Sequence, residues 1–351
     1  MIGTLKRSSY AISRHLGLTE IVAHSTWRRR RLLILCYHGI ALDDEHLWNP
    51  SLYVSQSHFE QRLALLRKHD CTVLPLGEAI ERLYRNDLPE RAIVLTFDDG
   101  YHDFDARAWP ALRSFGYPAT VYLTTARVEH NLPIVNLFVS YLLWRARTEV
   151  LDGSGILGLS GRYTLAQASE RQRVVREMDK AVQAEGLSAG AKDVIARDIA
   201  GRLHLDYDAL VARRVLTLMR PADVSRLSRE GLDVQLHTHL HRTPADPVRF
   251  VSDVLENRRR IEAMTGVRPT HLCYPSGIYR NSYLPALASE GIASATTCDP
   301  GLATRASEPL LLPRFIDTTF ITPHEFDAWT TGVASCLPRR TRRAHSDSDA
   351  G

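Results

Sequence analysis

The chain has 351 residues, of which 44% are hydrophobic and 24% are charged, which is close to the composition of an ordinary globular protein. A formal net charge of only +4, without an aromatic-rich basic motif, argues against a nucleic-acid partner. The five cysteines form no CxxC pair, which argues against a zinc ribbon or a disulfide framework and fits a reducing compartment.

The excess positive charge lies at the two ends of the chain, in "WRRRR" (27–31) and "RRTRR" (339–343). An anionic membrane surface suits such runs better than nucleic acid does. The first residues lack the apolar run and cleavage site of a secretory signal, and no apolar stretch is long enough to span a bilayer. We therefore expect a basic, helical segment over 1–31 that contacts a membrane peripherally, and a cytoplasmic chain at the inner membrane surface.

Predicted strands and helices alternate from this point. The pattern predicts a strand at 30–40, a helix at 58–71, a strand and then a helix within 72–86, a strand at 91–97, a helix at 105–116 and a strand at 117–125. The strand at 91–97 is a continuous apolar run, which is typical of a strand buried on both faces. Such alternation indicates a parallel sheet or barrel with helices outside.

A segment dominated by helical patterns interrupts the alternation at about 129–232, and we interpret it as an insertion. The alternation then resumes, with strands predicted at 232–238, 270–277, 292–298 and 310–317 and helices at 247–266, 282–291 and 322–335. The polar residues 339–351 are expected to be disordered. We infer one domain at 32–338 that carries the insertion.

"TFDDG" places Asp98 and Asp99 just after the buried strand at 91–97. Open α/β sheets and barrels carry their active sites at this end of the strands. Asp-Asp-Gly also suits an ordinary turn. Two adjacent carboxylates repel each other, however, and a bound cation would remove that cost.

"HTHLH" supplies candidate ligands for such a cation. His237 and His239 are two residues apart, which would place them on one face of a strand, while His237 and His241 are four apart. Histidines at this spacing at the end of a strand are typical of metal ligands, although a run of surface or core histidines would look the same.

Further polar residues lie at other predicted strand ends. They are His38 in "CYHGI", Tyr274, Pro275 and Gly277 in "LCYPSG", and Arg314 in "LLLPRFID". Each could face one common site, but a single residue of this kind is more often structural.

Together these segments resemble the polysaccharide deacetylases of carbohydrate esterase family four, whose domain is called the NodB-homology domain. "TFDDGYHDF" is similar to the first motif of the family, "HTHLH" to its His-Ser/Thr-x-x-His motif, and "CYPSG" stands in the place of its third. The resemblance covers residues 32–336 without the insertion. It implies an α/β fold, a distorted (β/α) barrel with the site at the carboxyl ends of the strands.

The resemblance also implies roles for individual residues. Asp98 would be the general base, and Asp99, His237 and His241 would bind a divalent metal, usually Zn²⁺. Tyr101 and the residues of "YPSG" (Tyr274, Pro275 and Gly277) would contact the substrate. The family pattern favours a middle histidine, His239, that points away from the metal rather than acting as a third imidazole ligand.

Two motifs depart from the family pattern. Cys273 stands near the place where the third motif commonly has an arginine, and "LPR" (312–314) stands where the last motif commonly has Leu-x-His. We hypothesise that Arg314 replaces the missing arginine beside Asp98 and that His38 lines the site as a proton donor.

The expected function is metal-dependent removal of an N-acetyl group from an amino sugar, in a surface polysaccharide, an oligosaccharide or a precursor of either. Two alternatives stay open. One is a non-catalytic carbohydrate-binding protein on a deacetylase fold, as the altered motifs would allow. The other is a deformylase or amidase acting on a lipid-linked amino sugar, for which the same residues would serve.

Overall fold

The computed structural model describes residues 18–336, and these fall into two compact units. Within the described range, unit 1 comprises residues 18–100, 104–126 and 221–336, and unit 2 comprises residues 101–103 and 127–220. Most of the expected basic segment at 1–31 and the expected disordered tail at 339–351 lie outside the described residues. No helix among residues 18–336 has both the length and the apolar character needed to cross a membrane.

Unit 1 is built around a nine-stranded sheet. Its main path runs β11-β10-β9-β6-β5-β1-β12, with β13 paired to β1 and β4 paired to β5. These strands are β1 (Arg31–Tyr37), β4 (Thr72–Val73), β5 (Ala92–Asp99), β6 (Thr120–Leu123), β9 (Asp233–Leu236), β10 (His271–Cys273), β11 (Ser294–Thr296), β12 (Ala303–Thr304) and β13 (Phe315–Ile316). All pairings are parallel except β1 with β12. A separate parallel pair joins β2 (Gly39–Ile40) to β3 (Tyr53–Val54).

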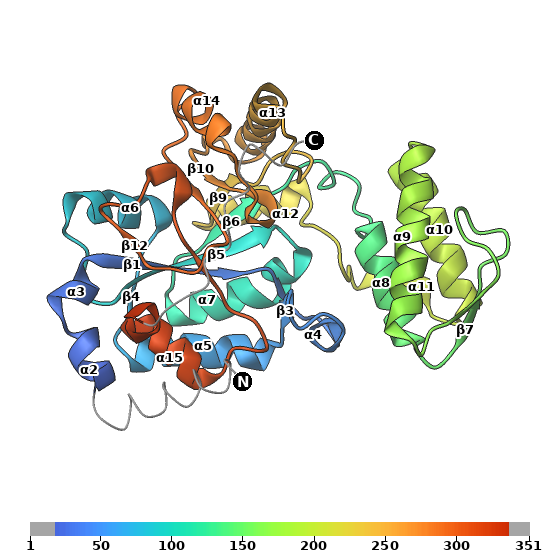
Figure 1. The fold of residues 1–351 in the computed structure, drawn as a ribbon, viewed down its shortest axis with the longest axis horizontal. Coiled ribbons are helices and arrows are strands. Elements are labelled where there is room, and N and C mark those ends of the chain that lie inside the picture. Colours follow the sequence, from blue (N-terminus) through green and yellow to red (C-terminus); the bar gives the residue numbers. More distant parts are fainter. Residues whose placement is uncertain (1–17, 337–351) are drawn as a thin grey trace. The chain divides into compact units, whose positions relative to one another are not determined.

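Helices cover this sheet. They are α2 (Leu18–Ala23), α3 (Thr26–Arg29), α4 (Glu45–Trp48), α5 (Gln56–Lys68), α6 (Leu76–Arg85), α7 (Trp109–Phe115), α12 (Pro221–Arg229), α13 (Pro247–Thr265), α14 (Leu284–Ser289) and α15 (Pro323–Thr331). Short helical turns are η1 (Phe104–Ala108), η2 (Pro275–Gly277), η3 (Asn281–Tyr283), η4 (Pro309–Leu311) and η5 (Val333–Cys336). Within unit 1, α5 and α15 lie on one side of the strands and α13 and α14 on the other (Figure 1).

The central strands are buried on both faces, as the continuous apolar run at 91–97 predicts. All eight residues of β5 are buried, and so are six of the seven residues of β1. Because β1, β5, β6 and β9 are parallel, their carboxyl ends reach the same edge of the sheet. "TFDDG" and "HTHLH" therefore emerge at the same edge of the sheet, from β5 and β9 on either side of β6.

Unit 2 is mainly helical, as the sequence of the insertion predicts. It contains α8 (Val135–Arg145), α9 (Ala168–Ala184), α10 (Ala189–Arg202) and α11 (Tyr207–Ala212). It also contains an unpredicted antiparallel hairpin of β7 (Val150–Asp152) and β8 (Arg162–Thr164), whose buried positions are only Leu151 and Tyr163. The helix α12, which the sequence reasoning assigned to the insertion, lies instead in unit 1, where it packs on α13 and β9.

The basic run at 27–31 is not simply a solvated surface. Arg28 is fully buried, and its guanidinium donates to three backbone carbonyls, those of Thr330 at 3.0 Å, Arg31 at 2.6 Å and Ala92 at 3.4 Å. Burial lowers the pKa of Arg28 to about 10. One of the arginines expected to face a membrane therefore fastens the start of the chain to the sheet and to α15.

Candidate active site

The acidic pair ends β5 with an abrupt change of backbone direction. Asp99 has φ 70° and Gly100 has φ 84°, so two successive residues lie in the left-handed region, which costs free energy for aspartate and not for glycine. The two carboxylates are both buried, and each meets a different set of partners.

Asp99 meets two histidines from the loop after β9. Its Oδ1 lies 3.3 Å from Nε2 of His237 and 3.2 Å from Nε2 of His241. The three candidate ligand atoms all lie within 4.8 Å of one another. The side chains thus converge as the sequence reasoning expected, while their role as metal ligands stays a prediction.

His237 is held so that one particular nitrogen faces Asp99. Its Nδ1 lies 2.8 Å from the carbonyl oxygen of Cys273, which can only accept a hydrogen bond, so Nδ1 carries the hydrogen and Nε2 is the atom left for a ligand. Its backbone N–H donates to Oδ1 of Asn257, whose Nδ2 donates in turn to Thr125 and to the carbonyl of Leu123. The sequence reasoning missed Asn257, because a polar residue on the buried face of the helix α13 carries no motif.

One carboxylate and two imidazoles fit a divalent cation of borderline softness such as Zn²⁺. Burial by itself would raise the pKa of Asp99, but the two imidazoles outweigh it and hold that pKa well below its usual range. Asp99 is therefore ionised at neutral pH. Because the side chain of His241 is 41% exposed, the cluster is open to solvent on one side, as a catalytic metal requires.

His239 points away from this cluster. Its Nδ1 lies 3.0 Å from the hydroxyl of Thr125, and its carbonyl accepts hydrogen bonds from Ala126 N–H and the Thr124 hydroxyl. The strand argument for His237 and His239 was wrong, because β9 already ends at Leu236 and Thr238 has φ 61°. The left-handed backbone at Thr238 directs the side chain of His239 away from the side on which His237 lies.

Asp98 forms a bidentate ion pair with Arg314. Nη1 donates to Oδ1 at 2.7 Å and Nη2 to Oδ2 at 2.9 Å, while Nε donates to the carbonyl of Thr297 at 2.9 Å. Burial opposes ionisation of Asp98, but the guanidinium outweighs it and holds the pKa of the carboxyl far below its usual range. With both oxygens occupied by a cationic group, Asp98 is a poor metal ligand, so the groupings of Asp98 with Cys36 and His38, or with His237 and Cys273, are weaker metal candidates.

The hypothesis that placed Arg314 beside Asp98 agrees with this geometry, but its local structure differs from the expectation. Arg314 comes immediately before the short strand β13 and not at the end of a longer strand. Since β13 pairs with β1 next to β5, the residue before it reaches Asp98.

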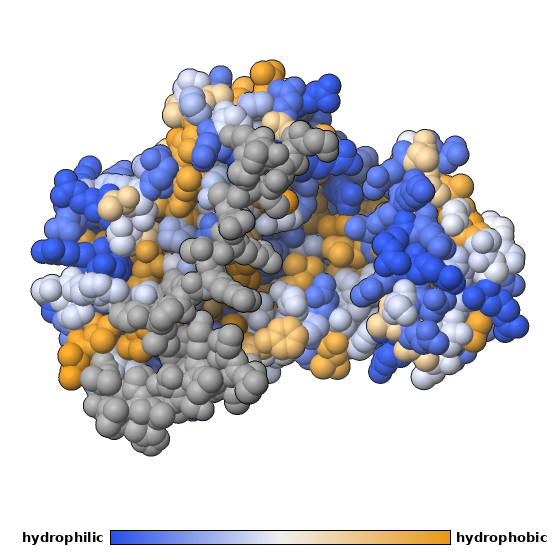
Figure 2. Space-filling model, viewed as in Figure 1, coloured by the Kyte–Doolittle hydropathy of each residue, from blue (hydrophilic) through white to orange (hydrophobic). Residues whose placement is uncertain are grey.

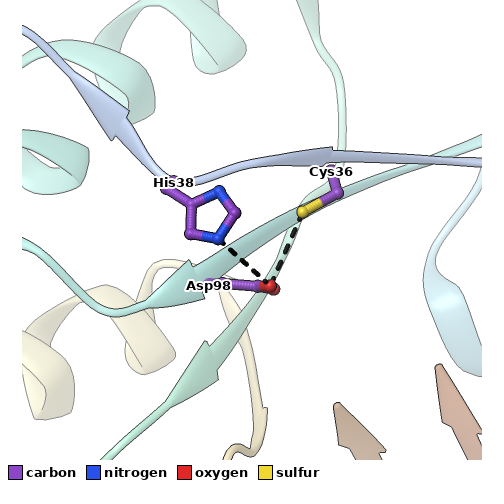
Figure 3. Close-up of side chains that lie close together, drawn as sticks. All are labelled: Cys36, His38 and Asp98. Atoms are coloured by element: carbon purple, nitrogen blue, oxygen red, sulfur yellow. Dashed lines mark hydrogen bonds and ion pairs between the residues drawn. The ribbon is translucent and has the colours of Figure 1, made fainter. Parts of the chain in front are cut away.

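Three more side chains surround Oδ2 of Asp98. The Sγ atoms of Cys36 and Cys273 lie 3.6 Å and 3.5 Å from it, and Nε2 of His38 lies at 3.8 Å. Figure 3 shows Cys36 and His38 pointing from neighbouring positions of the first strand region toward Asp98. Burial lowers the pKa of His38 below its usual value, although the carboxylate of Asp98 acts in the opposite direction. The sequence reasoning proposed His38 and noted Cys273 only as a departure from the family motif, and it did not place either thiol beside Asp98.

The residues of "YPSG" are packed in the interior near the end of β10. Tyr274 has no exposed surface, and its ring stacks on Phe250 with 6.1 Å between centroids. Pro275 is also buried. Gly277 has φ 70°, and a Cβ there would lie 2.5 Å from Cβ of Cys298. These positions explain "YPSG" through packing, while the expected contacts of Tyr274, Pro275 and Gly277 with substrate stay a prediction.

Tyr101 belongs to unit 2. It forms an antiparallel bridge with Leu218, and only 2% of it is exposed. Its expected contact with substrate stays a prediction.

Comparison with known proteins decides the family. The model of a family described as polysaccharide deacetylase matches residues 85–295. The chain belongs to this family. The match includes Asp98, Asp99 and the histidine loop, whereas His38 and Arg314 lie outside it.

Curated relatives from two organisms carry the name poly-beta-1,6-N-acetyl-D-glucosamine N-deacetylase. The protein of Staphylococcus aureus (strain MRSA252) is 29% identical over 136 residues, which cover 36% of this chain and 46% of that protein. The protein of Escherichia coli (strain K12) is 31% identical over 102 residues, which cover 28% of this chain and 15% of that protein. The match therefore spans less than half the length of either relative.

Solved deacetylase structures share the fold. Streptococcus pyogenes deacetylase PplD in complex with acetate has a TM-score of 0.56 at 19% identity, with 84% of this chain and 96% of that chain covered. IcaB from Ammonifex degensii has a TM-score of 0.53 at 16% identity, with 86% and 97% covered. The expected α/β fold, a distorted and incompletely closed barrel of parallel strands, is confirmed.

Proposed function

We propose that this polysaccharide deacetylase family member is a metal-dependent hydrolase that removes N-acetyl groups from glucosamine residues of a polysaccharide, an oligosaccharide or a precursor of either. The observation that carries the proposal is the arrangement at the end of β5. Asp99 joins two imidazoles suited to a cation, while the adjacent Asp98 is held separately by Arg314.

Asp99, His237 and His241 would hold the divalent cation, for which we propose Zn²⁺. When bound, such an ion polarises an acyl carbonyl and acidifies water. The hydrogen bond from Nδ1 of His237 to the carbonyl of Cys273 would fix the ring and increase the basicity of Nε2.

Asp98 would accept the proton of the attacking water. The guanidinium of Arg314 keeps the carboxylate ionised at neutral pH and fixes the directions of both oxygens. The resulting hydroxide would add to the carbonyl carbon of the acetyl group. The bond between that carbon and the sugar nitrogen would then break as the amine takes up a proton and leaves. The products are acetate and the free amino sugar.

His38 would supply that proton. Its Nε2 lies 3.8 Å from Oδ2 of Asp98, and 21% of its side chain is exposed, so it can face both the base and a ligand. Its lowered pKa favours the neutral ring at neutral pH, so the ring must first take up a proton before it can donate one. The proton that Asp98 accepts from water is the proposed source.

The substrate proposal is supported by the relatives named as poly-β-1,6-N-acetylglucosamine deacetylases. We therefore propose β-1,6-linked N-acetylglucosamine oligomers as the first substrates to test. The expected cytoplasmic location and the membrane contact of residues 1–31 stay predictions.

A pair of histidine variants tests the metal site. We expect His241→Ala to weaken zinc binding by at least about tenfold, because removal of even an outer partner of a metal ligand costs 10–100-fold. His239→Ala is the matched control, two residues away in the same loop, and should bind zinc normally. Metal retained after dialysis against a zinc buffer is the measurement. Equal loss of zinc in both variants, or no loss in either, would contradict the assignment.

Product analysis tests the reaction. The zinc-loaded protein should release acetate from N-acetylglucosamine oligomers, and Asp98→Asn should slow the release by about 10²–10⁴-fold without loss of the metal. Stoichiometric zinc with no acetate from any oligomer would favour a carbohydrate-binding protein instead. Release of formate from an N-formylated amino sugar, without acetate release, would favour a deformylase.

A further inference from the structure

A cavity lies in unit 1 apart from the candidate active site, and none of the proposed catalytic or metal residues lines it. It is open to solvent, has a volume of about 620 Å³ and lies between α3, the end of α6 and the turn after β12. This volume lies within the range of small-molecule sites. Its walls include Trp27, Arg30 and Arg31 on one side and Thr304 and Arg305 on the other.

The cavity is strongly cationic. Three arginines line it, and no aspartate or glutamate does. Arg30 and Arg305 are both exposed, and in the described part of the chain neither forms an ion pair. Most other arginines of unit 1 have a carboxylate or a backbone carbonyl as a partner, as Arg29 has Glu90 and Arg91 has Glu20. Two guanidinium groups are therefore available to an anion from solvent.

The side of the cavity formed by α3 and Arg31 is held in place by contacts within the protein, without a bound ligand. The buried Arg28 fastens this segment to the sheet through its hydrogen bonds to Thr330, Arg31 and Ala92. The guanidinium of Arg31 lies over the ring of Trp27, 4.0 Å from its centroid, and donates to the Trp27 carbonyl at 2.6 Å. A wall of this rigidity loses little conformational entropy on binding.

The opposite wall is a hydrogen-bonded turn. The Ser307 hydroxyl accepts from the N–H of Thr304, the Ser307 N–H donates to the Thr304 carbonyl at 2.9 Å, and the Tyr84 hydroxyl of α6 donates to the Ser307 carbonyl at 2.9 Å. These bonds hold the turn in which Arg305 lies. Arg305 thus faces the cavity from a defined backbone position.

We propose that this cavity binds the phosphate group of a phosphorylated ligand. Guanidinium groups pair with phosphate oxygens through two parallel hydrogen bonds, and a doubly charged phosphate can satisfy several cationic donors at once. A single carboxylate has only two oxygens and one charge, so it would leave part of this donor set unpaired.

The phosphate could belong to a soluble phosphate ester or to a lipid headgroup. Figure 2 shows a hydrophilic surface over α3 and α6 that borders a more hydrophobic area over α2. On α2 the side chain of Ile21 is 68% exposed. A membrane surface would contact both areas at once, so the experiment needs one arm for each source.

Calorimetric titration with pyrophosphate tests the site itself. We expect the wild-type protein to bind it, and the double variant Arg30→Ala/Arg305→Ala to bind at least about tenfold more weakly, because two of the charged groups that would pair with the phosphate oxygens are removed. Arg229→Ala on α12 is the control, since it removes an exposed arginine outside the cavity. Unchanged thermal unfolding would show that the variants keep their fold.

Vesicle flotation identifies the source of the phosphate. Binding to vesicles that contain phosphatidic acid, whose phosphate is a monoester, but not to pure phosphatidylcholine, with loss in the double variant and competition by pyrophosphate, would identify a lipid headgroup. Pyrophosphate binding without vesicle binding would identify a soluble ester. The proposal is overturned if neither probe binds, if glucuronate binds more tightly than pyrophosphate, or if Arg229→Ala weakens binding as much as the double variant.

Discussion

Asp98 shows how much of the candidate site depends on contacts between single residues. Its carboxylate meets side chains that come from separate parts of the chain, namely Cys36, His38, Cys273 and Arg314. Arg314 alone contacts both oxygens, and the two thiols and the imidazole all lie near Oδ2. The guanidinium therefore sets the orientation of the carboxylate, and the other three groups limit what else can approach Oδ2.

Arg314→Lys tests this orientation. Lysine keeps the positive charge but loses the two parallel hydrogen bonds, so the carboxylate should shift and kcat for acetate release should fall by about 10²-fold. Steady-state kinetics measures the loss, and circular dichroism checks that the variant folds. The double variant Asp98→Asn/Arg314→Lys should be no slower than Asp98→Asn alone, because both residues act through one interaction. Full turnover of a folded Arg314→Lys protein would contradict the proposed role.

At the scale of elements, the turn after β10 is constrained by close packing. Gly277 combines a left-handed backbone with contact against Cys298, whose Sγ lies 3.7 Å from Nη2 of Arg314. Gly266, which ends α13, has nearly the same φ, 72° against 70°, but no atom within 4 Å of the place a Cβ would take. Alanine at either position would have a strained left-handed backbone, but only at Gly277 would it also overlap a neighbouring side chain.

Gly266→Ala should lose about 1–2 kcal/mol of unfolding free energy, which is the cost of a left-handed alanine. Gly277→Ala should lose more, and it should also lower acetate release because Cys298 must move beside Arg314. Denaturant unfolding and activity assays give the two measurements. If both variants lose the same free energy of unfolding and keep full activity, the side chain of Cys298 moves aside at little energetic cost.

The strand β10 also carries a buried histidine that affects stability at low pH. Only 9% of His271 is exposed, its Nδ1 lies 2.9 Å from the Ser294 hydroxyl, and burial lowers its pKa below the usual 6.5, with Asp233 acting weakly in the opposite direction. The unfolded chain therefore binds a proton more readily than the folded protein does. The free energy of unfolding should be unaffected by His271 above about pH 6.5 and should fall as the pH drops below that value.

His271→Gln should flatten this decline between about pH 6.5 and 5, as measured by urea unfolding at several pH values. The same substitution at the exposed His324 is the control and should leave the slope unchanged. An identical slope in wild type and His271→Gln would show that other groups cause the acid sensitivity.

At the scale of the whole molecule, the chain divides into two units, and unit 2 interrupts unit 1 in the sequence. Each has its own buried core, with Leu63 in unit 1 and Leu142 in unit 2 both fully buried. Units of this kind usually unfold with some independence. We therefore expect two calorimetric transitions.

Matched cavity variants test this division. Leu142→Ala should destabilise one transition and Leu63→Ala the other, each by about 2–5 kcal/mol. Differential scanning calorimetry resolves which transition moves. If both variants shift a single common transition, the two units unfold cooperatively and the prediction of two transitions is wrong.

The sequence could predict the features that depend on apolar runs within a segment and on the order of motifs along the chain. Continuous apolar runs predicted β1 and β5, and the order of the motifs predicted the parallel edge where "TFDDG" and "HTHLH" meet. It could not predict the left-handed backbone of Thr238, which separates His239 from its neighbours, since threonine rarely adopts that conformation. Nor could it predict that Arg28 is buried, because the carbonyls that satisfy it come from distant segments.

The pairing of Asp98 with Arg314 joins residues 216 positions apart, whereas Asp99 and both its histidines have already been synthesised when the chain reaches position 241. A growing chain extends by about 5–20 residues per second. On the ribosome, the three side chains that would hold a cation are thus present several seconds before the guanidinium that orders Asp98. The nascent protein would acquire its capacity to bind an ion before it acquires an oriented base, so hydrolysis would begin only after position 314 has been synthesised.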